Sequence, residues 1–526
     1  MRFPALLAVL GWSVSASAVP AADYVLTIGG GHSPQGNQVS LEKNVRFFSR
    51  ALEELLPDAK HTILFADGGD PHRDVQYTDP DAPLPRVYEL LARVLNQTDH
   101  LVERYRNHEL PHVDGAASRE NIRDWFDHAA ETLEGDDRVI LYVTAHGGRA
   151  ADRKRPRNTT LYLWNDEITV DDLSRELDKL PESVPVVVVM VQCYSGGFAD
   201  LIFNDADVKD RPTAHNRSGF YATTHTRVAA GCTPDIDEAD YHEYSSSFWA
   251  AILGETRTGE PVEPADYDGD GAVSFAEAHA YVLLTSDTID IPVTTSDALL
   301  RGYSSEHPRT PPVVASRDEP SADTSETDEA APTQVTALRP VAPLTASSPV
   351  TELVEVAGPV EKKVITGLSE QLGLTRPDRA IEARAAAKKI EDERKELRSR
   401  IRRLEREYHH LQEAIETDLL AEWPELAGTW NPDARRLVAE TPDDVVGLVE
   451  SHEHFEEFDR LEAEILQREA EQLDLERRWV KCQRLLQTLE TVALAHNLPL
   501  AADSELLSRY ELLRAAEHAT LVPAKP

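Results

Sequence analysis

Two short segments combine a reactive side chain with glycines. Residues 144–148 read Thr-Ala-His-Gly-Gly, with the histidine at His146, and residues 192–197 read Gln-Cys-Tyr-Ser-Gly-Gly, with the cysteine at Cys193. A thiol needs a nearby base to become a nucleophilic thiolate, and an imidazole can return that proton to a leaving amine. Glycines let a substrate approach the backbone, whose N–H groups can stabilise an oxyanion. His146 and Cys193 are therefore the candidate pair for acyl transfer.

The elements that must position this pair are two apolar runs. Residues 139–143 precede His146, and residues 184–191, the most apolar run of the chain, precede Cys193. From about residue 24 to residue 300, such runs alternate with helical patterns, which predicts an α/β fold with a mostly parallel sheet flanked by helices. Ligands bind beyond the carboxyl ends of parallel strands. If the two runs are neighbouring strands, His146 and Cys193 emerge side by side.

The chain divides into four predicted parts. Residues 1–22 have the pattern of a signal peptide, with Arg2, an apolar stretch and a small-x-small cleavage site at Ala16-Ser17-Ala18. This predicts a secreted or periplasmic protein, and no later apolar run is long enough to span a membrane after signal cleavage. Residues 23–303 form the predicted α/β domain, in which a polar insertion over 67–118 carries one helix at 87–107.

The remaining two parts differ sharply in pattern. Residues 304–375 include a stretch rich in proline, serine, threonine and acids with little periodicity, which predicts a disordered linker. In residues 376–520, apolar positions recur at steps of three and four between charged residues, which indicates a C-terminal α-helical coiled-coil hairpin. Each apolar stripe needs a partner, so residues 379–492 are predicted to pair with each other, with a second copy or with a partner helix.

Charge and cysteine content narrow the classes of function. The 93 acidic and 54 basic residues of the 526 give a formal net charge of −39. Nucleic acid requires clustered positive charge, so we expect no nucleic-acid partner. Three cysteines in an exported chain of this length do not make a disulfide scaffold. The rival pair of Cys232 and His225 lacks a preceding apolar strand and paired glycines, and Cys232 is predicted to be a packed residue near the cleft.

The order of these motifs resembles a known clan of peptidases. A His-Gly after one strand and a cysteine after the next long strand resembles the pattern of the clan of caspases, metacaspases, legumains and gingipains. The separation of His146 and Cys193 is close to that in caspases, where the histidine lies about 50 residues before the cysteine. The Cys-Tyr-Ser-Gly that begins at Cys193 resembles the Cys-x-Ser-Gly of legumains and metacaspases. The resemblance extends from about residue 24 to residue 253. It implies a cysteine endopeptidase acting on protein or peptide substrates, with Cys193 as nucleophile, His146 as acid and base, and the amides of Gly147 and Cys193 as oxyanion hole.

One position departs from the clan. Caspases and metacaspases have glutamine or an acid two residues before the nucleophile, and legumains have glutamate. This chain has Val191 there, with Gln192 one place later. Val191 and Gln192 are therefore the candidate substrate-binding residues, and no residue preference at the cleavage site carries over.

A second motif predicts a metal site. Residues 266–277 match the twelve-position calcium loop at every slot, with a glycine, Gly271, at the turn. Prolines precede the loop, so the entering half of a helix-loop-helix is missing. Calcium prefers such an all-oxygen set, and we expect a structural calcium ion. The predicted ligands are Asp266, Asp268, Asp270, Ala272, Ser274 and Glu277.

Two alternatives to peptide hydrolysis remain open on these observations. A legumain-like transamidase would use the same acyl-enzyme and differ only in the nucleophile that resolves it. A non-catalytic, calcium-binding envelope scaffold would act through its coiled coil. A thiol-reactive peptidyl probe separates the scaffold from both enzymes, because only an enzyme gives a His146-dependent adduct on Cys193.

Overall fold

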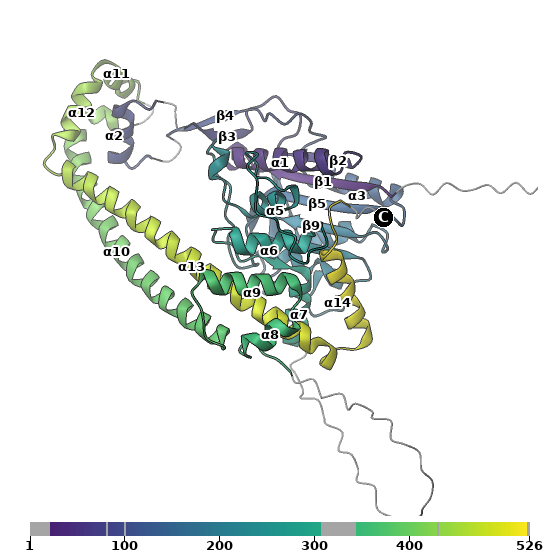
Figure 1. Cartoon of the computed structure of the whole chain (residues 1–526). Coiled ribbons are helices and arrows are strands. Elements are labelled where there is room, and N and C mark those ends of the chain that lie inside the picture. Colours follow the sequence, from purple (N-terminus) through teal and green to yellow (C-terminus); the bar gives the residue numbers. More distant parts are fainter. Residues whose placement is uncertain (1–20, 80–82, 99–100, 307–342, 429–430, 523–526) are drawn as a thin grey trace, which may run out of the picture.

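The computed structural model describes residues 21–79, 83–98, 101–306, 343–428 and 431–522 (Figure 1). Of the predicted signal peptide, residues 1–20 lie outside the described residues, as does the 307–342 portion of the predicted linker. Among the described helices, none combines the length and the apolar character needed to cross a bilayer.

A six-stranded sheet forms the centre of the protein, in the order β11-β10-β9-β5-β1-β2. Its strands are parallel except for β11, which pairs antiparallel with β10. The predicted mostly parallel sheet flanked by helices is therefore confirmed. The strands are β1 (Asp23–Gly30), β2 (Lys60–Phe65), β3 (Val75–Thr78), β4 (Glu103–Arg106), β5 (Arg138–Ala145), β6 (Gly147–Gly148), β7 (Thr160–Leu163), β8 (Asp166–Thr169), β9 (Val186–Met190), β10 (Arg217–Tyr221) and β11 (Val293–Thr294).

Helices cover both faces of this sheet and form the C-terminal region. The α-helices are α1 (Val39–Leu55), α2 (Arg86–Val94), α3 (Arg119–Thr132), α4 (Val170–Leu177), α5 (Tyr244–Leu253), α6 (Phe275–Thr285), α7 (Thr295–Glu306), α8 (Val350–Val356), α9 (Pro359–Gln371), α10 (Arg379–Glu422), α11 (Pro432–Glu440), α12 (Pro442–Glu450), α13 (Phe455–Ala501) and α14 (Ser504–Glu517). The 3-10 helices are η1 (Pro34–Gly36), η2 (Ser195–Ile202), η3 (Asn204–Ala206), η4 (Glu238–Asp240) and η5 (Pro424–Ala427).

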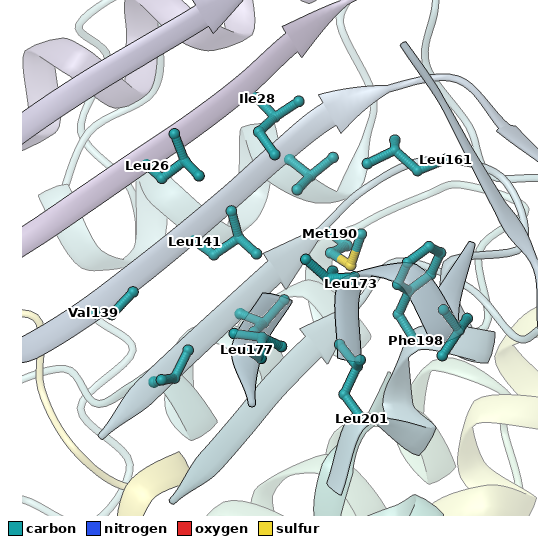
Figure 2. Packing of buried hydrophobic residues seen from close by; sticks show 14 of the residues in the cluster. Leu26, Ile28, Val139, Leu141, Leu161, Leu173, Leu177, Met190, Phe198 and Leu201 are labelled. Carbon is teal, nitrogen blue, oxygen red and sulfur yellow. The ribbon is translucent and has the colours of Figure 1, made fainter. Parts of the chain in front are cut away.

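The alternation of side chains along the strands produces two hydrophobic layers. On one face Leu26, Leu141 and Met190 pack with α3, α4 and η2, as Figure 2 shows for this cluster. On the other face the next residues along the same strands, such as Val25 and Ile140, pack with α1, α5 and α6. Successive residues of a strand point to opposite faces, and each fully buried aliphatic side chain contributes about 1.5–3 kcal/mol. The central strands are thus held rigidly from both sides.

The register of the central strands places the candidate pair side by side. Val143 of β5 is matched with Met190 of β9, the last matched pair of these two strands. His146 and Cys193 each lie three residues beyond that pair. The two strands are parallel neighbours, so both residues leave the sheet at its carboxyl edge, as the sequence predicted.

The prediction of a disordered linker over 304–375 is wrong for most of the residues that the structure describes there. Helix α7 extends to Glu306, and α8 and α9 lie within the range. Apolar residues of α8 and α9, among them Leu353 and Val364, pack against α13 and the end of α6. The overall composition of this stretch, rich in proline, serine, threonine and acids, hid a regular apolar spacing in its last part.

The predicted helical hairpin is confirmed. Helices α10 and α13 pack along each other and are joined at the tip by α11 and α12 (Figure 1). At the tip, apolar residues of α2, such as Leu90, join Ile415 and Phe458 in one cluster. The insertion helix predicted over 87–107 is wrong in its second half, because α2 ends at Val94 and 103–106 form β4, which pairs with β3. Both ends of the hairpin are therefore anchored on the α/β domain.

Candidate active site

His146 is oriented by the loop that follows β1. Its Nε2 lies 2.7 Å from the backbone oxygen of Gly36 and 2.9 Å from Oε1 of Gln38. Both partners are acceptors, so Nε2 carries the ring proton and Nδ1 holds the lone pair of the neutral imidazole. The free lone pair is the one that can take a proton from a thiol.

The loop of residues 31–38 is itself fixed by a buried asparagine. Oδ1 of Asn37 accepts a hydrogen bond from the amide of Gly31 at 3.0 Å, and its Nδ2 donates to the carbonyl of Asp74 at 2.9 Å. Sequence reasoning missed Gly36 and Gln38 as orienting groups. The available signal was β1 itself, because its neighbour in the sheet is β5 and their carboxyl ends meet.

Cys193 is held by the loop that follows β10. The amide of Ala229 donates to Sγ at 3.3 Å, and Sγ lies 3.9 Å from the Ala229 carbonyl oxygen. The next residue, Tyr194, has φ = 60° and ψ = 16°, in the left-handed region. Non-glycine residues in this region are strained by about 1–2 kcal/mol, so the turn after Cys193 must be held by its surroundings.

The two candidate segments touch through their backbones. A Cβ added to Gly147 would lie 2.0 Å from the carbonyl oxygen of Cys193 and 2.7 Å from Cγ of Gln192, so only glycine fits after the histidine. Among the described residues, no hydrogen bond joins the His146 imidazole to the Cys193 thiol, whose partners are both atoms of Ala229. Direct proton transfer between them therefore requires the thiol and Nδ1 to come within hydrogen-bond distance of each other.

The two predicted substrate-binding residues differ in their surroundings. Val191 is 8% exposed and belongs to the hydrophobic cluster beside α5, so its side chain serves the packing of the core. Gln192 is 1% exposed, and neither Oε1 nor Nε2 has a hydrogen-bond partner among the described residues. Buried polar groups are normally paired, so the amide of Gln192 has unused capacity next to the nucleophile.

Burial favours the neutral form of both reactive groups. Burial lowers the pKa of His146, and nearby His32 adds to this effect, whereas the hydrogen bond to Gly36 opposes it. Burial raises the pKa of the Cys193 thiol, which the amide of Ala229 opposes and the carboxylate of Asp290 reinforces. A neutral imidazole beside a neutral thiol suits a general-base step better than a preformed ion pair.

The calcium loop is only partly assembled as a binding site. Carboxylate oxygens of Asp266, Asp268 and Asp270 lie within 4.8 Å of one another. The carboxylate of Glu277 instead accepts hydrogen bonds from the amides of Tyr267, Asp268 and Ser274 and caps α6. Three of the predicted ligands therefore come together and fit a hard cation, and Glu277 would have to turn to join them.

A second group of potential metal ligands was not found from the sequence. Asp67, Asp70 and His72 offer oxygen and nitrogen atoms within 4.8 Å of one another. His72 and Asp70 are exposed and paired with each other at 2.8 Å. Their spacing matches no metal motif, so nothing in the sequence singles them out.

The fold and the site define an α/β protein whose mostly parallel sheet carries a histidine and a cysteine on neighbouring strand ends. No protein-family model and no curated protein matches the sequence. Among solved structures, the chain is similar to a structural-genomics target from Geobacter sulfurreducens, at 13% identity and a TM-score of 0.30, over 50% of this chain and 88% of that one. It is also similar to caspase-1 from Spodoptera frugiperda, at 12% identity and a TM-score of 0.25, over 44% and 69%. Both are distant likenesses of part of the fold.

Proposed function

We propose that this protein is a cysteine endopeptidase that cleaves peptide bonds through a thioester acyl-enzyme. The observation that supports it best is the matched position of His146 and Cys193 on neighbouring parallel strands, with Gly147 packed against the backbone of Cys193. The hydrogen bonds of Nε2 leave Nδ1 of His146 as the base. A thiol, a base and a glycine-lined backbone are the parts that acyl transfer requires.

In the first half of the proposed reaction, Sγ of Cys193 attacks the peptide carbonyl carbon. The thiol proton passes to Nδ1 of His146, and the carbonyl oxygen becomes an oxyanion that the amides of Gly147 and Cys193 stabilise. The carbon–nitrogen bond then breaks, and the imidazolium returns its proton to the leaving amine. The product is a thioester on Cys193.

In the second half, His146 takes a proton from a water molecule that attacks the thioester carbon. The carbon–sulfur bond breaks, the acid product leaves, and the proton returns to the sulfur. We propose that the amide of Gln192, which has no partner among the described residues, turns toward the cleft to pair with the bound substrate. We also propose that the 266–277 loop binds calcium. Because residues 1–22 have the pattern of a signal peptide, we propose that the protein acts outside the cytoplasm.

The proposal is tested by a peptidyl probe with a thiol-reactive warhead, used on the full chain. We expect one adduct, mapped by mass spectrometry to Cys193, that forms at least roughly 100-fold more slowly in the His146→Ala variant. A peptide library read with and without an added amine then separates hydrolysis from transfer to the amine. An unlabelled wild type, or an adduct that forms equally fast without His146, would refute the peptidase.

A further inference from the structure

The loop after β10, residues 222–232, is the immediate support of the candidate nucleophile. Its Ala229 contacts the Cys193 sulfur through both backbone polar atoms. The amide of Tyr194, the residue in the left-handed conformation, donates to the carbonyl of Arg227 at 2.8 Å. The position of the thiol and the strained turn after it therefore depend on where this loop lies.

Helix α13 of the C-terminal hairpin contacts one side chain of this loop, that of Arg227. The Arg227 guanidinium donates to Oε1 of Glu476 at 2.7 Å and lies over the ring of Trp479, 5.3 Å from its centroid. Arg394 of α10 pairs with the same glutamate. The side chains of Arg227 and Glu476 are 23% and 21% exposed, so water screens this pair less than a surface pair.

A second side chain of α13, Arg484, supports the same loop indirectly, through Asp290. Arg484 is 1% exposed and donates to the carbonyls of Leu283, Ser286 and Asp290. The carboxylate of Asp290 in turn accepts a hydrogen bond from the amide of Ala230 at 2.7 Å. The helix thus supports the residues on both sides of Ala229.

The same helix borders a groove that reaches Tyr194, the residue after Cys193. A groove of about 390 Å³ lies between Tyr194 and Val228 on one side and Gln472 and Leu473 of α13 on the other. Val228 and Leu473 are 46% and 42% exposed. A polypeptide that reaches Cys193 along this groove would pass α13.

We propose that α13 is part of the peptidase site, with Glu476 as a positioning residue that clamps Arg227 and so fixes the loop that holds Cys193. This role rests on the proposed function. If the loop is already ordered, the entropic cost of placing the nucleophile does not add to the activation free energy. Small misplacements of a nucleophile reduce turnover steeply. The clamp touches neither the thiol nor the imidazole, so it acts on kcat through the position of the loop. Arg227 and Glu476 also line the groove, and KM reports any part that they have in substrate binding.

The test compares two alanine substitutions on α13 in the full chain. Glu476→Ala removes the clamp, whereas Glu471→Ala removes a glutamate that pairs only with Arg468 of its own helix among the described residues. We expect Glu476→Ala to lower kcat roughly 10-fold with KM changed by less than about 3-fold, and Glu471→Ala to change neither. Glu476→Gln, which keeps an acceptor for Arg227, should recover part of kcat.

Amide hydrogen exchange supplies a readout that needs no activity. Glu476→Ala should speed exchange at Tyr194, Ala229 and Ala230 by roughly 5-fold, with unchanged exchange in the β5 and β9 strands. Unchanged exchange at those three amides, or equal effects of the two variants, would overturn the clamp. If the wild type cleaves nothing, the peptidase proposal fails, and exchange alone still decides whether the clamp exists.

Discussion

Two cysteines follow neighbouring strands of the sheet, and they differ in the hydrogen bond that their sulfurs receive. Cys193 follows the buried strand β9, receives a hydrogen bond from the amide of Ala229, and lies against Gly147. Cys232 ends the loop after β10 in a left-handed conformation, with φ = 59°. Burial raises its thiol pKa strongly, and the carboxylate of Glu243 raises it further. Both thiols therefore have a carboxylate that raises their pKa, Asp290 for Cys193 and Glu243 for Cys232. Only Cys193 also accepts a hydrogen bond from a backbone amide among the described residues.

This difference shows that proximity to the site does not make a thiol a nucleophile. A thiolate needs N–H donors or a positive charge, and a carboxylate nearby disfavours it. Glu243 is itself buried, where it accepts from Arg257 at 3.1 Å, so its position is set by that pair and not by Cys232. We therefore expect Cys193 to react and Cys232 to stay inert.

Replacing each cysteine in turn gives the largest expected contrast. Cys193→Ala should reduce peptide cleavage at least about 1000-fold, because no other described residue supplies a nucleophile at that strand end. Cys232→Ala should leave kcat/KM within about 3-fold. Cleavage is measured on a peptide chosen from the library. Circular dichroism of both variants serves as the control for folding, and activity that follows Cys232 instead would reverse the assignment.

A methyl group at Gly147 should disturb one cysteine and spare the other. The added Cβ of Gly147→Ala would lie 2.0 Å from the Cys193 carbonyl oxygen, so the backbone of one segment must move. We expect turnover to fall roughly 100-fold. The extent of Cys232 labelling should be the same as in the wild type, under both native and denaturing conditions. Gly135→Ala is the matched control, since its Cβ would meet only Ser183 Oγ, at 3.9 Å. Equal activity of both variants would show that the two segments are not in contact.

The sequence predicted the elements of the site better than the contacts between them. Apolar runs ending in His146 and Cys193 predicted parallel strands, because such runs and their flanking residues are local properties. The orienting role of the Gly36 carbonyl could not be predicted, because every residue has a backbone carbonyl and its contacts do not depend on the residue type. The contact between Arg227 and Glu476 joins residues far apart in sequence, and an arginine and a glutamate each suit a solvated surface equally well.

The helices after residue 343 show a different limit. Residues 304–375 are rich in proline, serine, threonine, alanine and acids, a composition that favours disorder. The apolar residues of α8 and α9, such as Leu368, gain stability only from α13 and α6, which lie far away in the chain. The apolar spacing of α9 is a local sign of a helix, but the partners that bury it are set by tertiary packing and cannot be predicted from that spacing.

The pH dependence of labelling separates the two cysteines further. The thiolate is the reactive form, and burial raises the pKa of Cys193 above its ordinary value. Iodoacetamide labelling of Cys193 should therefore increase about 10-fold per pH unit up to at least pH 9, without the plateau of an activated thiolate near neutrality. Cys232 should remain unlabelled over that range, and mass spectrometry distinguishes the two. A plateau of Cys193 labelling below pH 8 would indicate a preformed ion pair with His146.

Calcium removal should have the smallest effect on either cysteine, because the 266–277 loop contacts neither of them among the described residues. Helix α6 begins at Phe275 with the Ser274–Glu277 capping box, and Phe275 is fully buried, so protein groups alone hold the start of this helix. A chelator should therefore lower the melting temperature by only about 5 °C, the shift expected when the free calcium concentration is about 100 times the Kd. Cys193 labelling should change less than about 2-fold.

The control for the chelator is a variant that cannot bind the ion. Asp268→Asn removes one of the three converging carboxylates, so its melting temperature should no longer respond to calcium or to the chelator. A chelator response that persists in this variant would place the bound ion elsewhere. A large loss of Cys193 labelling on chelation would mean that the loop governs the nucleophile, because α6 leads directly into the segment that ends at Asp290 and holds the amide of Ala230.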